Sequence, residues 1–468
     1  MGLGHCKEIL EKLFSLYPSA FMDDMPWMQD GHTIIDDGLM RMRFVTGPRF
    51  DYSFTGEEFY KLFTGVIFSA LDGTCGTWVE SFDISRWVPR QKEGEQIKRT
   101  QSRGKAEEKD PSKAWKKYPK GSRFCDEGVI TDDTKPAEAF DIRGVVSYPH
   151  HREAVITYVI ERLESHPIPL GTQIIIDFDT EAPVQIVRRE GTNYNDAFRL
   201  EEHKHLFGEA DMQMGLYAWL FRDNDIEIRS GDTDTLAVIG ALLESAAQPF
   251  KHKVVWSRGA LRGAQQAKEV VNVKAKARRI MEAKAKGKRL SEQMPDKVRT
   301  QHKSIDLKAL VNVMAMQGIS MKVFIMIMCH GMGSDYNEKK NLAAQTNVGT
   351  LWMHMLAHKD KLDEICWENA SLVNRGQACV WERVLGHPDV QKNCGIEYPE
   401  WQGKGDEDEG YNAARDTLWW FWTNAPRRKD DTASLADQEK GVLMTLWGTM
   451  YWMFPWSVIT KSAPSPFG

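Results

Sequence analysis

Hydrophobic and polar residues follow two different periods in the first 80 positions of the chain. In residues 6–18 and 56–71 apolar side chains recur every three or four positions, which is the spacing of an amphipathic helix. Residues 32–37 (HTIIDD) are a short apolar run that ends in two acids, which indicates a buried strand. The two patterns together predict α/β structure.

The same alternation returns in the middle of the chain. Residues 152–164 predict a helix and residues 171–177 a buried strand. Residues 210–221 predict another helix, residues 225–230 a strand, and residues 234–243 form a further apolar segment. Helices and strands that alternate in this way build a parallel sheet covered on both faces. We therefore expect an α/β fold with a central, mostly parallel, twisted sheet and helices on both faces.

Composition departs from this pattern in three segments. Residues 85–140 are rich in Lys, Arg, Gly and Ser without periodic apolar positions, which predicts a basic insertion that stays mobile or orders on binding. Residues 251–303 carry sixteen Lys or Arg against four acids and have high helix propensity, so we expect a basic helical insertion that tracks phosphates or, alternatively, an exposed charged face. Residues 361–468 carry nine of the sixteen Trp and predict a mostly helical, Trp-rich extension that packs on the core or binds a protein partner.

The whole-chain composition excludes several classes of protein. With 42% hydrophobic and 27% charged residues and a net charge of -5, the chain is neither disordered nor a globally basic nucleic-acid binder. Seven dispersed Cys without a C-x-x-C pair disfavour a zinc site and a disulfide framework, and no secretory signal is visible. We expect a protein of a reducing intracellular compartment, nucleus or cytoplasm, that is not secreted. Residues 441–460 are uncharged, but Gly448 and Pro455 favour a buried helix over a membrane span, so no membrane partner is expected.

Carboxylates stand where predicted strands end or predicted helices begin. They are Asp36, Asp177, Asp179, Glu209, Asp211, Asp232, Asp234 and Asp335. Ligands of open α/β sheets gather at the carboxyl ends of strands, so these acids are candidates for one crevice. Converging carboxylates repel one another unless divalent cations hold them, and Mg²⁺, with Mn²⁺ as a substitute, suits such ligands. Each acidic pair alone is equally typical of a helix N-cap or a solvated turn.

Several separated motifs together resemble one family. HTIIDDGLMRMRF, FDTEAPVQ, GEADMQ, SGDTDTLAVIG and HGMGSDYN are similar, in this order, to the metal-binding motifs of the flap endonuclease superfamily of structure-specific 5′ nucleases, which have a PIN-like fold. The resemblance implies a nuclease core over residues 1–360. It places seven acids in the catalytic and metal-binding positions: Asp36, Asp179, Glu209, Asp211, Asp232, Asp234 and Asp335.

The resemblance also implies a mechanism. Two Mg²⁺ or Mn²⁺ ions would hydrolyse phosphodiester bonds through an activated water. Asp179, Glu209 and Asp211 would hold one ion, while Asp232, Asp234 and Asp335 would hold the other, with Asp36 nearby. Arg188 and Arg189 would grip the scissile phosphate, although two surface arginines are an equal alternative. The predicted phosphate contacts of the basic segment are Lys274, Lys276, Arg278 and Arg279.

Two departures from the family bear on the substrate. Only thirty positions separate Asp179 from Glu209, too few for the helical arch through which flap endonucleases thread a free 5′ end. Residues 331–365 form a degenerate version of the family's helix-two-turn-helix and keep only Gly349 of its turns. We expect a DNA nuclease of the repair type that acts on branched or single-strand-containing DNA. The alternatives are an RNA endonuclease of the viral host-shutoff type and a catalytically inactive nucleic-acid-binding or structural module.

Overall fold

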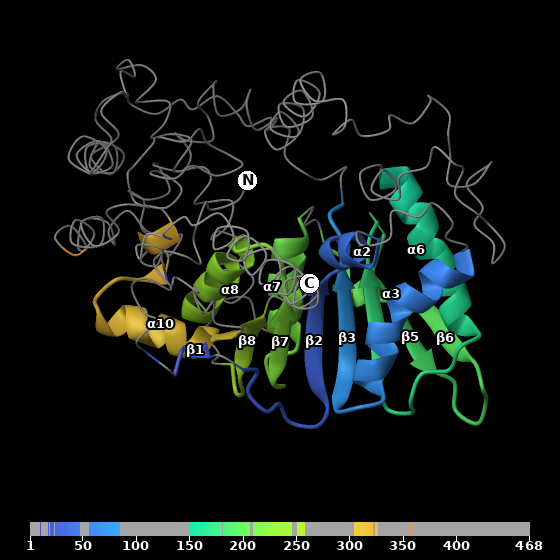
Figure 1. Ribbon diagram of the computed structural model, residues 1–468, viewed down its shortest axis with the longest axis horizontal. Coiled ribbons are helices and arrows are strands. Elements are labelled where there is room, and N and C mark those ends of the chain that lie inside the picture. The colour runs from blue at the N-terminus through green and yellow to red at the C-terminus, as the bar shows by residue number, and fades with distance from the viewer. Residues whose placement is uncertain are drawn as a thin grey trace, which may run out of the picture.

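Segments far apart in the chain meet in one nine-stranded sheet (Figure 1). The computed structural model describes residues 10, 17, 19–22, 24–46, 56–84, 149–179, 181–205, 209–245, 250–257, 304–321, 323–325 and 356. The strands are β1 (Phe21–Met22), β2 (His32–Asp37), β3 (Cys75–Ser81), β4 (Gln173–Asp177), β5 (Val184–Arg188), β6 (Asn195–Arg199), β7 (Ile226–Arg229), β8 (Val254–Ser257) and β9 (Ser304–Asp306). Their order across the sheet is β1-β9-β8-β7-β2-β3-β4-β5-β6.

The sheet is mixed, so the prediction of a mostly parallel sheet is wrong. Parallel pairings join β8, β7, β2, β3 and β4, whereas β9 and β1 at one edge and β5 and β6 at the other edge pair antiparallel. Only residues 178–183 connect β4 to β5, and only residues 189–194 connect β5 to β6. Such short links turn the chain back on itself, because a parallel neighbour needs a crossover of a dozen or more residues.

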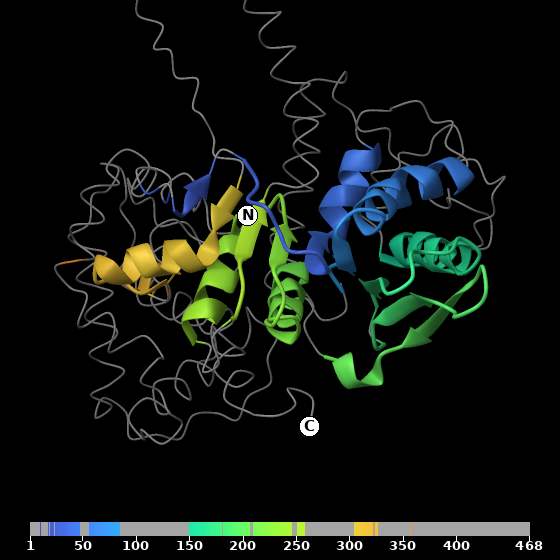
Figure 2. The same ribbon diagram turned by 90° about the horizontal axis from the view of Figure 1, so that it is seen from below.

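Helices cover both faces of the sheet, as predicted (Figure 2). They are α2 (Gly38–Thr46), α3 (Gly56–Leu71), α6 (Pro149–Glu164), α7 (Ala210–Leu220), α8 (Asp234–Ser245) and α10 (Leu307–Met316), with a short 3-10 helix, η3 (Glu201–His203). Phe63 of α3 and Val159 of α6 share one core with Trp78 and Ile174 of the sheet. Helix α7 lies on the opposite face, where Tyr217 contacts Asp177, and α8 packs beside it.

The predicted elements with strong periodicity are confirmed. The helices expected over residues 56–71, 152–164 and 210–221 and the strands expected over residues 32–37 and 225–230 appear within three residues of those bounds. In α3 the buried Phe59, Phe63 and Ile67 recur every fourth position and form the stripe that faces the sheet.

One glycine brings the ends of β2 and β3 together. Gly38 opens α2 directly after β2, and the Phe82 ring that follows β3 lies so close that a Cβ atom at position 38 would be 2.4 Å from it. A larger residue at position 38 would therefore displace the buried Phe82 ring.

Several predicted segments lie outside the described residues. These are the basic insertion over residues 85–140, the Trp-rich extension over residues 361–468, and all but residue 356 of the region 331–365. Of the basic segment 251–303, the structure describes residues 251–257, and Val254–Ser257 form strand β8 instead of a helix. Within the part of the chain that the structure describes, every helix is too short or too polar to cross a lipid bilayer.

Candidate metal centre

The candidate site lies at the carboxyl ends of the parallel strands. From β2 the chain continues to β3 and β4 on one side, and later returns to β7 and β8 on the other side of β2. A reversal of this kind opens a crevice outside the strand ends, where open α/β sheets bind their ligands. The acids expected after β2, β4 and β7 therefore share one edge of the sheet, and their distances along that edge decide which of them meet.

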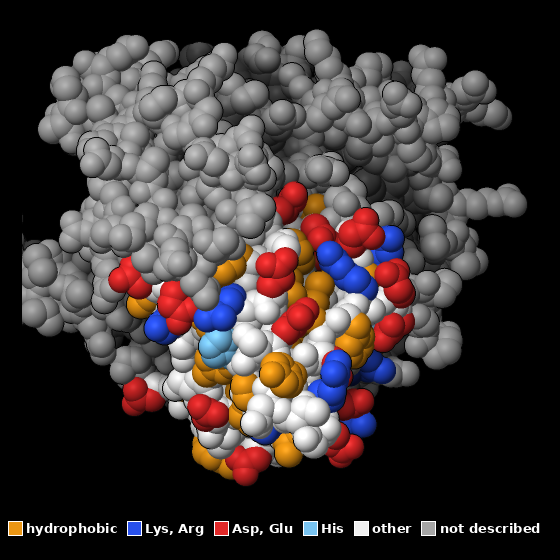
Figure 3. Space-filling view, turned by 90° about the vertical axis from the view of Figure 1, so that its right-hand side faces the viewer, with side chains coloured by type: hydrophobic (Ala, Val, Ile, Leu, Met, Phe, Trp, Pro, Cys, Tyr) orange, Lys and Arg blue, Asp and Glu red, His pale blue; other side chains and the backbone are white. Residues whose placement is uncertain are grey.

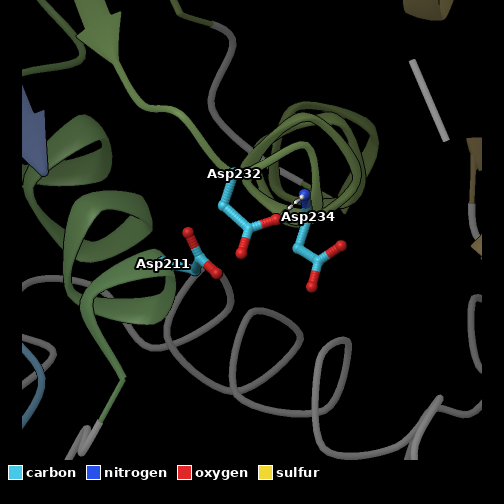
Figure 4. A group of neighbouring side chains, drawn as sticks. All are labelled: Asp211, Asp232 and Asp234. Atoms are coloured by element: carbon cyan, nitrogen blue, oxygen red, sulfur yellow. Dashed lines mark hydrogen bonds between the residues drawn. The ribbon is translucent and has the colours of Figure 1, made fainter. Parts of the chain in front are cut away.

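Three of the predicted acids form a compact triad (Figure 4). One carboxylate oxygen each from Asp211, Asp232 and Asp234 lies within 4.8 Å of the other two. Asp211 is in the first turn of α7, Asp232 is in the loop after β7, and Asp234 is the first residue of α8. Asp232 is exposed, Asp211 is half-buried and Asp234 is buried. The triad is thus anchored in the protein on one side and open to solvent on the other.

Helix termini and backbone hydrogen bonds stabilise the three carboxylates of the triad in their positions. Asp211 and Asp234 both stand in the first turn of a helix, where the positive end of the helix dipole stabilises an acid. The backbone amide of Asp234 donates a hydrogen bond of 3.2 Å to Oδ1 of Asp232, and the amide of Asp232 donates one of 3.0 Å to the Ser230 hydroxyl. The loop between β7 and α8 is therefore held by its own polar side chains.

Glu209 and Asp83 lie next to the triad at the start of α7. Glu209 is the buried N-cap residue of α7, and its carbonyl accepts hydrogen bonds from the amides of Met212 and Gln213. The Oδ1 atom of Asp83, two residues after β3, accepts a hydrogen bond of 3.0 Å from the amide of Ala210. This contact ties the end of β3 to the helix that carries Asp211. Asp83 is not among the acids predicted from the sequence, because the Gly- and Thr-containing β3 lacks a strong apolar run, although FD directly after the strand was the available signal.

Asp37 is the second acid that the sequence analysis missed. Its pKa is raised to about 7, chiefly by burial; the nearby carboxylates of Asp83, Asp36 and Asp232 add to the rise, and the hydrogen bond from the Met40 amide opposes it. Asp37 thus lies within the electrostatic range of the triad and of Asp83. Consecutive side chains of a strand point to opposite faces of the sheet, which separates Asp37 from Asp36.

Asp36 lies in a different environment from the triad. Its Oδ2 atom is 3.0 Å from Nε of Arg41, and the same Nε donates a hydrogen bond of 2.7 Å to Glu80. All three side chains are buried, and Arg41 also donates to the carbonyl of Phe63 at 2.6 Å. Burial first, and then the charge of Glu80, hold the pKa of Asp36 well above its usual range. The structure places Asp36 in a buried ion cluster on the face covered by α3, apart from the triad.

Asp179, expected to be the second catalytic aspartate, is bound by an arginine. Its two oxygens accept hydrogen bonds from Arg199 at 2.9 and 2.7 Å, and the amide of Glu181 donates another at 2.9 Å. Three strand spacings separate β4 from β7, which is about 14 Å at the usual spacing. Asp179 is therefore not among the acids that the structure brings together with Asp232.

Arg188 and Arg189 lie at the wrong end of the sheet to contact a phosphate at the triad. Strand β5 runs antiparallel to β4, so Arg188 lies beside the start of β4. Arg189 pairs with Asp196, and Arg188 donates to the carbonyl of Thr192 at 3.3 Å. On the face of the molecule in Figure 3, basic and acidic side chains are interspersed rather than gathered by sign. The placement favours the alternative of two surface arginines.

A buried polar cluster fastens α7 to the end of β4. The Tyr217 hydroxyl donates a hydrogen bond of 2.9 Å to Oδ2 of Asp177, and Nε2 of His205 lies 2.6 Å from the same oxygen. Burial, followed by the charge of Asp177, raises the pKa of Tyr217 well above its usual range, so the hydroxyl keeps its proton. This cluster and the Asp83 contact hold the two ends of α7.

The remaining predicted site residues lie outside the described residues. They are Asp335, Lys274, Lys276, Arg278 and Arg279. Their roles stay predictions.

In comparisons with known proteins, no family model matches this chain and no curated protein sequence matches it.

Proposed function

We propose that this chain is a metal-dependent nuclease of the flap endonuclease type, which hydrolyses phosphodiester bonds in DNA that is branched or partly single-stranded. The observation that carries the proposal is the triad of Asp211, Asp232 and Asp234 at the carboxyl ends of the parallel strands. Three carboxylates this close repel one another. A divalent cation is the partner that makes such a group stable at neutral pH.

The donor set fits Mg²⁺ or Mn²⁺. The triad offers carboxylate oxygens only, which are the ligands of hard cations, and contains none of the His nitrogen or Cys sulfur atoms that zinc prefers. Asp211, Asp232 and Asp234 would hold one ion. Asp37 would add negative charge near this ion, because the carboxylates of Asp83 and Asp232 act on it electrostatically. Asp335 remains an additional ligand implied by the family resemblance.

The aspartates of the triad would hold the metal ion in place for the reaction. When bound, the ions supply the positive charge that activates a water and stabilises the leaving oxygen of the phosphodiester. The buried Asp234 and the hydrogen-bonded Asp211 fix the geometry from the protein side. Asp232 is exposed and faces the side from which a nucleic-acid strand would approach.

A substrate panel tests this proposal. Purified protein is mixed with labelled single-stranded, duplex, flap and hairpin substrates, each as DNA and as RNA, with Mg²⁺, Mn²⁺ or EDTA. We expect cleavage of the DNA substrates that contain single strands or branches, and no cleavage in EDTA. In the double variant Asp232→Asn/Asp234→Asn, cleavage should fall to the EDTA level.

The matched control is Asp196→Asn, which changes an aspartate at the opposite end of the sheet that pairs with Arg189. This variant should cleave like the wild type. Cleavage that survives in Asp232→Asn/Asp234→Asn would contradict metal catalysis at the triad. Cleavage of RNA alone would favour the RNA endonuclease, and binding without cleavage of any substrate would favour the inactive module.

A further inference from the structure

Thr235 connects the two helices that carry the triad. It is the second residue of α8 and its side chain is fully buried. Its Oγ1 atom lies 2.5 Å from Oδ1 of Asp211 on α7 and 3.1 Å from Oγ of Ser230 at the end of β7. The Ser230 hydroxyl in turn accepts the hydrogen bond from the amide of Asp232.

The chemistry of these groups fixes the direction of the chain of hydrogen bonds. An ionised carboxylate only accepts, so the single hydroxyl proton of Thr235 goes to Asp211. Thr235 then accepts from Ser230, whose oxygen accepts from the Asp232 amide. The result is one continuous path from the backbone of Asp232 to the carboxylate of Asp211. Both hydroxyl groups are buried, so water does not compete for them.

A buried helical threonine does not ordinarily make such a contact. Thr64 of α3 is buried to the same degree, and its hydroxyl donates to the carbonyl of Tyr60, one turn earlier in its own helix, at 2.7 Å. This is the usual local bond of Thr in helices. Thr235 is the second residue of α8 and has no carbonyl of its own helix one turn earlier, and it directs its proton to a carboxylate on another helix.

We infer that Thr235 is a positioning residue that holds Asp211 in the orientation in which the triad binds a divalent cation. The inference rests on the proposed metal chemistry. Mutual repulsion would turn Asp211 away from Asp232 and Asp234, and the hydrogen bond from Thr235 opposes this rotation while stabilising the negative charge. Partners of this kind are typically worth 10- to 100-fold in metal affinity.

Substitutions of Thr235 and of the comparison residue Thr64 test the inference. Thr235→Val keeps the buried volume and removes the hydroxyl, Thr235→Ser keeps the hydroxyl, and Thr64→Val makes the same change at the remote helical threonine. Mn²⁺ affinity is measured by calorimetry, and thermal unfolding in EDTA reports folding. We expect Thr235→Val to weaken Mn²⁺ binding roughly 10- to 100-fold. Thr235→Ser and Thr64→Val should remain within about threefold of the wild type on the same scale.

The outcomes separate this inference from the proposed nuclease function. Equal Mn²⁺ affinity in Thr235→Val and wild type overturns the positioning role, even if the wild type cleaves DNA. An equal loss in Thr64→Val also overturns it, because the effect would then be general. Mn²⁺ binding that depends on Thr235 in a protein that cleaves neither DNA nor RNA supports the inference and removes the nuclease proposal. A wild type that binds no Mn²⁺ overturns both.

A second variant keeps the test decisive if Thr235→Val does not fold. Ser230→Ala removes the donor to Thr235 and the acceptor of the Asp232 amide, and Ser230 lies outside both helices. It should weaken Mn²⁺ binding in the same direction. Unchanged affinity in a folded Ser230→Ala protein would contradict the proposed path of hydrogen bonds.

Discussion

Ser257 and Ser304 are directly paired residues of the antiparallel strands β8 and β9, although residues 258–303 lie between them in the chain. Strand β8 is parallel to β7, so Ser257 lies at the same edge of the sheet as the loop that carries Asp232. Residues 258–303 contain fourteen Lys or Arg and four acids. The two ends of this basic segment therefore lie at the edge of the sheet that carries the acidic site. We propose that its positive charge attracts the phosphates of a substrate.

The pairing of Ser257 with Ser304 predicts that residues 258–303 can be replaced by a two-residue Asn-Gly turn, because such a turn closes paired antiparallel strands. The fold should persist, as measured by thermal unfolding. Affinity for DNA should fall, and the slope of log affinity against log salt should become shallower by about 0.9 for each phosphate that the shortened protein no longer neutralises.

A full-length control isolates the charge. The variant with Gln at positions 274, 276, 278 and 279 removes Lys274, Lys276, Arg278 and Arg279 without shortening the chain. It should lower the salt slope in the same direction as the deletion. Unchanged DNA affinity in both proteins would assign the segment to solubility or targeting instead.

Asp36 and Asp37 should respond differently to the same substitution. Asp37→Asn removes a carboxylate within electrostatic range of Asp83 and Asp232, so Mn²⁺ affinity and cleavage should both fall at least about tenfold. Asp36→Asn alters the buried cluster with Arg41 on the other face, and Mn²⁺ affinity should stay within about threefold. Calorimetry measures the Mn²⁺ affinity of both variants, and the cleavage assay measures their activity. A larger loss of Mn²⁺ affinity in Asp36→Asn than in Asp37→Asn would indicate that Asp36 is a metal ligand, as the family resemblance implies.

Removal of the Asp37 charge should stabilise the metal-free protein above neutral pH. The folded-state pKa of about 7 lies above the usual value of 3.8, so the folded state binds an extra proton between these values and stability is lost as pH rises from about 4 to 7. Asp37→Asn lacks this loss. In EDTA, the free energy of unfolding of Asp37→Asn minus that of the wild type should be about 2–3 kcal/mol larger at pH 8 than at pH 5, which means a relatively more stable variant at pH 8.

Urea unfolding at the two pH values measures this difference. Carboxylates remote from Asp37 titrate alike in both proteins and cancel in the comparison, whereas those of Asp83, Asp36 and Asp232 interact with Asp37 and contribute to the difference. A difference that is the same at pH 5 and pH 8 would show that Asp37 has an ordinary pKa in the folded protein.

Arg41 should be essential for stability at neutral pH. It is the cation between the buried Asp36 and Glu80, and both carboxyl groups have pKa values raised by burial. Arg41→Met leaves them without this partner and should cost about 3–5 kcal/mol of unfolding free energy at pH 8. The cost should shrink at pH 5, because protonated carboxyl groups need no cation.

The control for this substitution is Arg162→Met. Arg162 pairs with Glu57 at 2.7 Å, and both side chains are 27% exposed. Ion pairs near the surface contribute about 1 kcal/mol or less. A loss in Arg41→Met no larger than in Arg162→Met would mean that the buried cluster does not depend on its cation.

The sequence by itself determined the elements and motifs whose signals are local. The stripe of Phe59, Phe63 and Ile67 specified α3, because a helix buries every third or fourth residue. The proximity of Asp232 and Asp234 followed from their spacing of two residues at the turn from strand to helix, and GEAD supplied Asp211.

Only the tertiary structure decided how these parts face one another. Strand direction depends on long-range pairing, so local patterns do not predict the antiparallel β5 that carries Arg188 away from the acids. The alternation of side chains separates Asp36 from Asp37, but the packing of α3 and α7 on opposite faces determines which of the two is enclosed with Arg41 and which lies near Asp232. Local patterns specify periodicity, whereas the assignment of each face and each strand end arises from contacts between residues distant in the chain.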